Sequence, residues 1–116
     1  MSDTIQQVLE ALKARKTSAR KITESRSQIR EAISTGILPL DKFVLGCGGL
    51  PVGRVTEVFS EEGGGKTSFV YQCIAQCQKA GGIAILVETE DAMDPERAAL
   101  FGVDTDNVIL LEPMDM

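Results

Sequence analysis

The sequence predicts a small α/β domain in which a parallel sheet is flanked by helices and preceded by a helical arm. From residue 54 onward the expected order is strand, loop, helix, strand, helix, strand, which favours parallel strands joined by right-handed crossovers. Residues 83–87 are nearly all apolar, as in a central parallel strand covered on both faces. A hydrophobic content of 43% in 116 residues allows one core.

Residues 1–32 are expected to form the N-terminal helical arm. Apolar residues recur there at helical spacing: Ile5, Val8, Leu9 and Leu12. They predict an amphipathic helix over residues 4–15, which Ser2 or Asp3 could cap, and a short helical piece follows around Gln28–Ile33. A single apolar stripe on a short helix needs a partner, either the chain's own domain or a neighbouring subunit.

Residues 33–116 are expected to form a partial nucleotide-binding core. Its predicted elements are a short helix at Asp41–Leu45, a strand at Arg54–Phe59, a helix at Lys66–Ala80, a strand at Ile83–Val87, a short helix at Pro95–Phe101 and a strand at Val108–Leu111. Gly81 and Gly82 end the long helix, and Asp94 followed by a proline begins the next one.

The loop before the long helix has the composition of a phosphate-binding loop. It consists of Ser60, Glu61, Glu62, Gly63, Gly64, Gly65, Lys66 and Thr67. Its glycines allow backbone N–H groups to turn toward a polyphosphate at the helix N-terminus, where Lys66 would reach the β- and γ-phosphates and Thr67 would hold Mg²⁺. Ser60 stands where the usual pattern has its first glycine, so an ordinary glycine-rich turn is the alternative interpretation.

Charge and cysteine content limit the function classes. The net charge is −5, but residues 1–36 carry seven Lys and Arg against four acids, whereas residues 37–116 carry five against thirteen. The basic segment is either a solvated helix face or a contact for nucleic acid. Three cysteines, no histidine and no signal peptide fit a reducing cytosol, with the cysteines as small buried apolar residues. No apolar run has the length of a membrane span.

Five stretches carry a resemblance to a known family: residues 34–41, 45–58, 65–67, 88–95 and 101–107. In their order and spacing they closely resemble bacterial and phage RecA-type recombinases. Residues 90–95, with the sequence Glu-Asp-Ala-Met-Asp-Pro, distinguish this branch from related ATPases. The resemblance implies a P-loop NTPase fold with a RecA-like parallel sheet, and ATP and Mg²⁺ as cofactors.

The resemblance also implies roles for individual residues. Glu90 matches the acid that polarises the attacking water, although crowded carboxylates there could simply be solvated. Asp94 matches the residue that meets the adenine, and it could equally cap the short helix. Arg97 stands where the family commonly has a tyrosine that stacks on the base, and its guanidinium plane could stack instead. Ser68 matches a hydroxyl near the α-phosphate. Of the loop acids, Glu62 fits the family pattern and Glu61 does not.

The function expected from the resemblance is that of an ATP-dependent DNA recombinase. Such a protein binds ATP and single-stranded DNA for filament assembly, homologous recombination and DNA repair, and its N-terminal helix packs on the adjacent subunit. This chain would carry the phosphate-loop part, in the cytoplasm of a bacterium or a phage-infected host. The second acidic strand and the DNA-gripping loops would lie beyond Met116, so we expect this chain alone to be inactive as a DNA-dependent ATPase and poorly stable. The alternative is a truncated, non-catalytic module that binds nucleotide or a recombinase subunit and regulates it.

Overall fold

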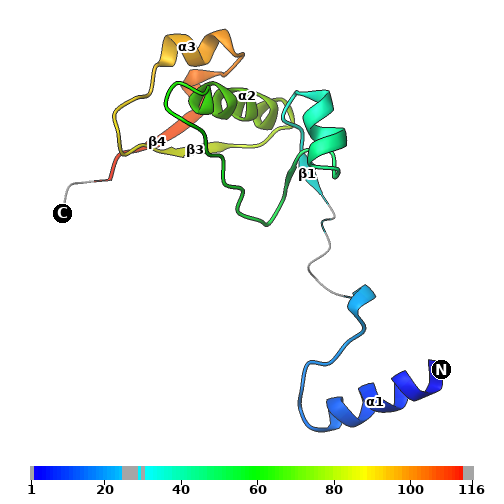
Figure 1. The fold of residues 1–116 in the computed structure, drawn as a ribbon. Coiled ribbons are helices and arrows are strands. Elements are labelled where there is room, and N and C mark those ends of the chain that lie inside the picture. The colour runs from blue at the N-terminus through cyan, green and yellow to red at the C-terminus, as the bar shows by residue number, and fades with distance from the viewer. Residues whose placement is uncertain (1, 25–28, 30, 114–116) are drawn as a thin grey trace.

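The fold is mixed α/β, with two short sheets (Figure 1). The computed structural model describes residues 2–24, 29 and 31–113. In chain order its elements are α1 (Ser2–Ala14), a 3-10 turn (Ile22–Glu24), β1 (Ala32–Ile33), a π-helical turn (Leu40–Val44), β2 (Leu50–Pro51), α2 (Lys66–Lys79), β3 (Ala84–Val87), α3 (Pro95–Leu100), a 3-10 turn (Thr105–Asn107) and β4 (Val108–Leu111).

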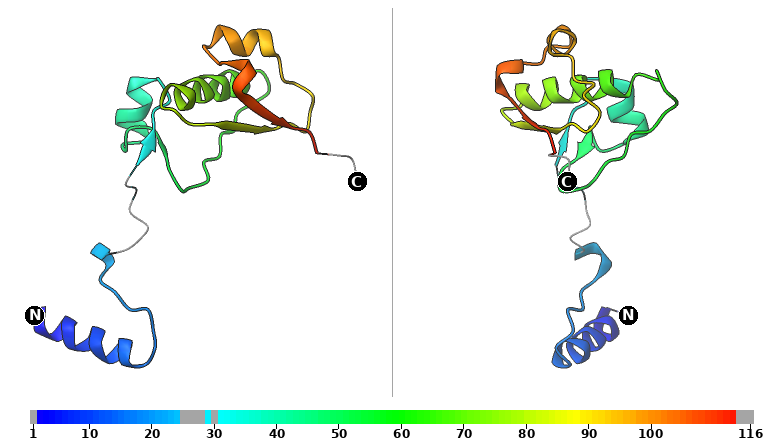
Figure 2. Two further views of the ribbon diagram at one scale, coloured as in Figure 1. Left: turned by 180° about the vertical axis from the view of Figure 1, so that it is seen from behind. Right: turned by 90° about the vertical axis from the view of Figure 1, so that its left-hand side faces the viewer.

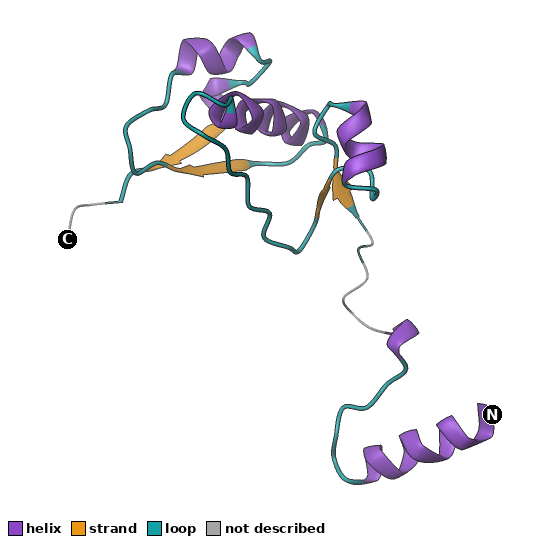
Figure 3. Cartoon of the chain, in the orientation of Figure 1, coloured by secondary structure: helices purple, strands orange, loops and turns teal. Residues whose placement is uncertain are grey.

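The main unit is a layered arrangement of α3, α2 and the β3–β4 sheet, with α2 in the middle (Figures 1 and 3). β3 and β4 are parallel, and their register runs from Ala84 opposite Val108 to Val87 opposite Leu111. The pair β1–β2 is antiparallel and joins Ala32–Ile33 to Leu50–Pro51. The parallel pairing, helix α2 and the strand at residues 108–111 confirm the corresponding predictions.

The core lies between α2 and α3. Its buried hydrophobic residues are Tyr71, Ile74, Ala75, Ala98 and Val103. The rings of Tyr71 and Phe101 are tilted against each other with centroids 6.0 Å apart, a separation typical of favourable aromatic pairs. This core fixes α3 against α2, and α3 begins as predicted, because Asp94 caps it with Pro95 at its first position.

The predicted strand at Arg54–Phe59 is wrong. Residues 55–59 have no regular secondary structure, and Val55 and Phe59 are 99% and 84% exposed. An extended apolar segment becomes a strand only when a neighbour satisfies its backbone N–H and C=O groups. Among the described residues, no neighbouring strand pairs with this segment. It crosses below α2 as an extended loop (Figure 1).

The prediction that the strand at residues 83–87 is covered on both faces is also wrong. Its burial alternates, and Ile85 and Val87 are each 60% exposed. Helix α2 covers one face only, so the other face of the sheet is open. The prediction of a helical piece around Gln28–Ile33 is wrong at its C-terminal end, because Ala32–Ile33 is a strand. Gln28 lies outside the described residues.

Helix α1 confirms the amphipathic helix expected over residues 4–15. It lies apart from the layered unit in both views of Figure 2, and its apolar stripe remains open, with Ile5 and Val8 50% and 53% exposed. The division of the chain into an arm of residues 1–32 and a core of residues 33–116 stays a prediction, as does a complete P-loop NTPase sheet. Within the described residues, no helix has both the length and the apolarity needed to cross a membrane.

Candidate phosphate-binding site

The glycine-rich loop ends at an uncapped helix N-terminus. Gly65 is the N-cap of α2 in a left-handed conformation, with φ 87° and ψ 16°, and no side chain caps the helix. The first backbone bond of the helix runs from the Phe69 N–H to the Gly65 carbonyl, at 2.9 Å. The N–H groups before Phe69 therefore have no intrahelical acceptor, and together with the helix dipole they favour an anion at this end of α2.

Gly64 lets the loop close on itself. A Cβ at this position would lie 2.3 Å from Ser60 Oγ and 2.9 Å from the Glu61 carbonyl oxygen. The Gly64 N–H also donates to that carbonyl, at 3.1 Å. The serine that replaces the usual first glycine thus fills the space that Gly64 leaves open. In the described chain the non-glycine residues with positive φ are Lys16 and Asp91, so Ser60 occupies its place without a left-handed backbone.

Lys66 is held over the loop by neutral oxygen atoms. Its Nζ donates to the Ser60 carbonyl at 3.0 Å, to Ser60 Oγ at 3.3 Å and to the Glu61 carbonyl at 3.4 Å. None of these acceptors is charged, so these bonds leave the positive charge of Lys66 uncompensated. An incoming phosphate would offer charged acceptors, which form stronger hydrogen bonds than carbonyls do.

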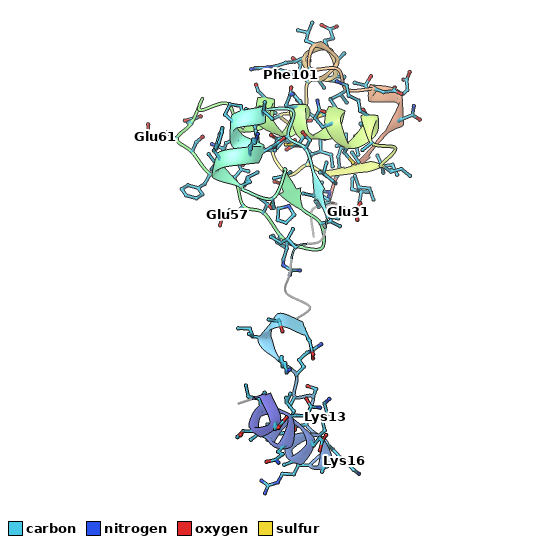
Figure 4. All side chains as sticks on the ribbon, turned by 90° about the vertical axis from the view of Figure 1, so that its right-hand side faces the viewer. Lys13, Lys16, Glu31, Glu57, Glu61 and Phe101 are labelled. Carbon is cyan, nitrogen blue, oxygen red and sulfur yellow. The ribbon has the colours of Figure 1, made fainter. Side chains whose placement is uncertain are left out.

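The loop, the first turn of α2 and Arg97 of α3 line an open cavity of about 340 Å³. It is lined by Glu62, Gly63, Gly64, Gly65, Lys66, Thr67, Ser68 and Arg97. This volume lies at the lower end of small-molecule sites, which span about 300–1,000 Å³. Glu61 is not part of this lining, and Figure 4 shows it at the outer edge of the loop. Of the two loop acids, Glu62 alone lines the cavity.

Arg97 reaches the loop because Asp94 and Tyr71 fix the start of α3. The Asp94 carboxylate accepts from the Arg97 N–H at 3.1 Å, and the Asp94 N–H donates to Tyr71 Oη at 3.0 Å. Arg97 Nη2 then donates to Ser68 Oγ at 2.9 Å, across to the first turn of α2. Tyr71 is not among the residues that the sequence predicts at the site. Its position three residues after Ser68, as the single tyrosine of the chain, was the available signal.

The structure does not bring every predicted residue to the cavity. Glu90 is exposed and lies beyond the end of β3, where its N–H donates to Glu88 Oε1 at 2.8 Å. Neither Glu90 nor Asp94 belongs to the cavity lining. The capping role of Asp94 is present, whereas its contact with adenine and the catalytic role of Glu90 stay predictions.

A second polar cluster holds the turn that precedes this site. Asp41 is buried and accepts from Ser34 Oγ at 2.6 Å, from Thr35 Oγ1 at 2.6 Å and from the Thr35 N–H at 3.0 Å. The hydrogen bonds from the Ser34 and Thr35 hydroxyls lower the pKa of Asp41. Burial, with a smaller contribution from the Asp41 charge, raises the pKa of the Cys73 thiol. This cluster is structural and lies outside the cavity lining.

The chain is similar to proteins of one family over nearly its whole length. The family model described as the RecA N-terminal domain matches residues 2–115. The chain belongs to this RecA family. Curated relatives named Protein RecA include those of Acinetobacter baylyi and Clostridioides difficile, each 45% identical over 98 residues, or 84% of this chain and 28% of the relative. Protein RecA of Caulobacter sp. strain K31 is 46% identical over the same length, which is 27% of that relative. The chain thus spans a little over a quarter of the length of these RecA relatives.

Proposed function

We propose that this chain binds ATP with Mg²⁺ at the loop of residues 60–68, as the phosphate-loop part of a RecA-type recombinase. The observation that carries the proposal is the cavity at the uncapped N-terminus of α2, with Lys66 Nζ over the loop and Arg97 in the same lining. The donor set fits a polyphosphate: backbone N–H groups, a lysine and two hydroxyls face the same cavity.

Each residue of the proposed site has a distinct task. The loop N–H groups would hold the phosphate chain, and Gly64 lets the loop close because a Cβ there would meet Ser60. Lys66 would exchange its loop carbonyls for β- and γ-phosphate oxygens. Thr67 would supply one oxygen to Mg²⁺, which takes its remaining ligands mostly from phosphates and water. Ser68 would lie near the α-phosphate.

Two carboxylates complete the proposal. Glu90 would orient the attacking water, since it follows the C-terminal end of β3, the end of a parallel sheet at which nucleotides bind. Asp94 would contact the adenine from the start of α3. Phosphoryl transfer depends mainly on such positioning and on charge stabilisation.

Replacing Lys66 tests nucleotide binding directly. We expect Lys66→Ala to weaken binding of a fluorescent ATP analogue by roughly 10- to 100-fold or more, because a charge-assisted hydrogen bond contributes about 1.5–3 kcal/mol. Lys79→Ala is the matched control, since it removes the same charge from the exposed far end of α2. Equal affinity of Lys66→Ala and the unsubstituted chain would show that the glycines form an ordinary turn.

For the whole protein we propose DNA-dependent ATP hydrolysis, filament assembly on single-stranded DNA, homologous recombination and DNA repair in the cytoplasm of a bacterium or a phage-infected cell. Relatives named Protein RecA and the matching RecA N-terminal domain support this assignment. ATPase rates of the intact gene product with and without single-stranded DNA test it. A rate that DNA does not change would contradict the recombinase assignment.

A regulatory module that binds a recombinase subunit is the second candidate. The exposed apolar stripe of α1 favours it, since Ile5, Val8 and Leu12 are available to a neighbouring subunit. The same stripe would serve filament assembly in a recombinase. If the chain is a regulator, it should lower the ATPase rate of a full-length recombinase, and Val8→Asp should abolish that effect.

A further inference from the structure

Arg97 contacts the phosphate end of the candidate site. Its Nη2 donates to Ser68 Oγ at 2.9 Å, and Ser68 lies in the first turn of α2, directly after Thr67. The guanidinium therefore forms part of the wall of the cavity that residues 62–68 line. A guanidinium stacked on a base beyond this turn would have to leave Ser68.

The position of Arg97 is fixed by buried neighbours. Its N–H is held by Asp94, whose own N–H is held by Tyr71 Oη, and Tyr71 is only 1% exposed. The next residue, Ala98, is fully buried in the core. Because both anchors are buried, α3 presents the Arg97 side chain to the loop from a defined position.

The chemistry of the cavity favours a second cation there. Lys66 supplies one positive charge, while Glu62 places a negative charge in the same lining. The guanidinium has five N–H donors in a planar fork that matches a phosphate, and its described partner at Ser68 is a neutral hydroxyl. A triphosphate carries several negative charges. Arg97 would offer it a second positive charge beside Lys66 and further N–H donors.

We infer that Arg97 is a phosphate-binding residue of this site and does not stack on the base. The inference rests on the proposed function, since it concerns the same nucleotide. Its consequence is that the site selects its ligand by the phosphate chain more than by the base. Inorganic tripolyphosphate should therefore compete with both ATP and GTP.

Displacement of a fluorescent ATP analogue from the 116-residue chain by ATP, GTP and inorganic tripolyphosphate tests this inference. Arg97→Ala should weaken ATP and tripolyphosphate by the same factor, roughly 10- to 100-fold for the loss of charge-assisted bonds. Arg97→Lys, which keeps the charge but loses the fork, should give a smaller loss for both ligands. Arg97→Tyr, whose ring can stack on a base, should lose tripolyphosphate binding and keep part of its affinity for ATP and GTP. Lys79→Ala controls for net charge.

The outcomes separate this inference from the proposed function. If Arg97→Ala weakens ATP but leaves tripolyphosphate unchanged, Arg97 contacts the base and the inference is overturned. If Arg97→Ala changes neither ligand while Lys66→Ala abolishes binding, the inference is overturned and the nucleotide site stands. If Lys66→Ala also leaves binding unchanged, the proposed function itself fails. Far-UV circular dichroism checks that α3 is retained, and Arg97→Lys decides between these outcomes if Arg97→Ala unfolds.

Discussion

Ser60 and Gly64 form one packing unit in the glycine-rich loop before α2. The Ser60 hydroxyl donates to the Glu61 carbonyl at 2.9 Å and occupies the space that a side chain on Gly64 would need. It also accepts one of the hydrogen bonds of Lys66, at 3.3 Å. A serine in place of the usual glycine thus ties the lysine to the loop and makes the glycine at residue 64 indispensable.

Gly64→Ala should weaken binding of a fluorescent ATP analogue by about 5- to 150-fold. This range corresponds to the roughly 1–3 kcal/mol that overpacking costs, because the new Cβ would lie 2.3 Å from Ser60 Oγ. The double variant Ser60→Gly with Gly64→Ala should recover part of the affinity, because it removes the clash with Ser60 Oγ. The recovery should be incomplete, since the Glu61 carbonyl oxygen would still lie 2.9 Å from the new Cβ. Identical losses in the single and double variants would show that the two residues do not interact.

Short elements of this fold depend on side-chain hydrogen bonds that connect them. Asp41, at the start of the π-helical turn, accepts three hydrogen bonds from Ser34 and Thr35, which follow β1 directly. Asp94 and Tyr71 join α3 to α2 in the same way. Two-residue strands and a six-residue helix are too short to be stable alone, so these bonds decide where each element lies.

Asp41 should make the stability of the chain depend on pH. Hydrogen bonds lower its pKa in the folded state, so its contribution to the free energy of unfolding is complete above the ordinary carboxyl pKa of 3.8. That contribution is lost as the pH falls through the lowered pKa. In urea titrations from pH 6 to pH 2, the stability difference between the unsubstituted chain and Asp41→Asn should therefore shrink on acidification. Glu57→Gln, at an exposed carboxylate, is the matched control (Figure 4). An unchanged difference for Asp41→Asn would contradict the pKa shift.

At the scale of the whole molecule, one face of the parallel sheet is open. Ile85 pairs with Ile109 and Val87 with Leu111, so the four side chains share the face that α2 does not cover. They are between 49% and 60% exposed. We call this set the open sheet face. Contiguous exposed apolar surface of this kind makes a chain prone to association and lowers its stability.

The open sheet face should bind a hydrophobic dye under native conditions. We expect Ile85→Thr with Val87→Thr to lower the fluorescence of bound anilinonaphthalene sulfonate by about half, because two of the four apolar side chains are replaced. Threonine is β-branched and suits a strand, so far-UV circular dichroism should not change. Val55→Thr, at a 99% exposed valine outside this face, is the matched control and should leave the signal unchanged. Equal fluorescence of all three proteins would contradict the assignment.

Local patterns were sufficient for the elements that make their own hydrogen bonds. The apolar spacing predicts α1 and α2, Asp94 followed by Pro95 predicts the start of α3, and the glycine-rich loop before Lys66 predicts where a phosphate would bind. These features are encoded within a few neighbouring residues, because helix bonds, caps and tight turns join residues close in sequence. The same holds for the motifs that link the chain to the RecA family.

Only the tertiary structure decided which segments pair and which residues meet. Arg54–Phe59 has the composition of a strand, but residues 55–59 pair with no described strand. Val87 is apolar, but it lies on the face of the sheet that no described helix covers. Likewise, Arg97 meets Ser68 because Tyr71 anchors α3, a contact between residues 29 positions apart. Sheet pairing, burial and such contacts depend on the neighbours that folding supplies, and a local pattern does not specify those neighbours. The sequence by itself determined the glycine-rich loop before Lys66; the fold determined that Arg97 reaches Ser68 beside that loop.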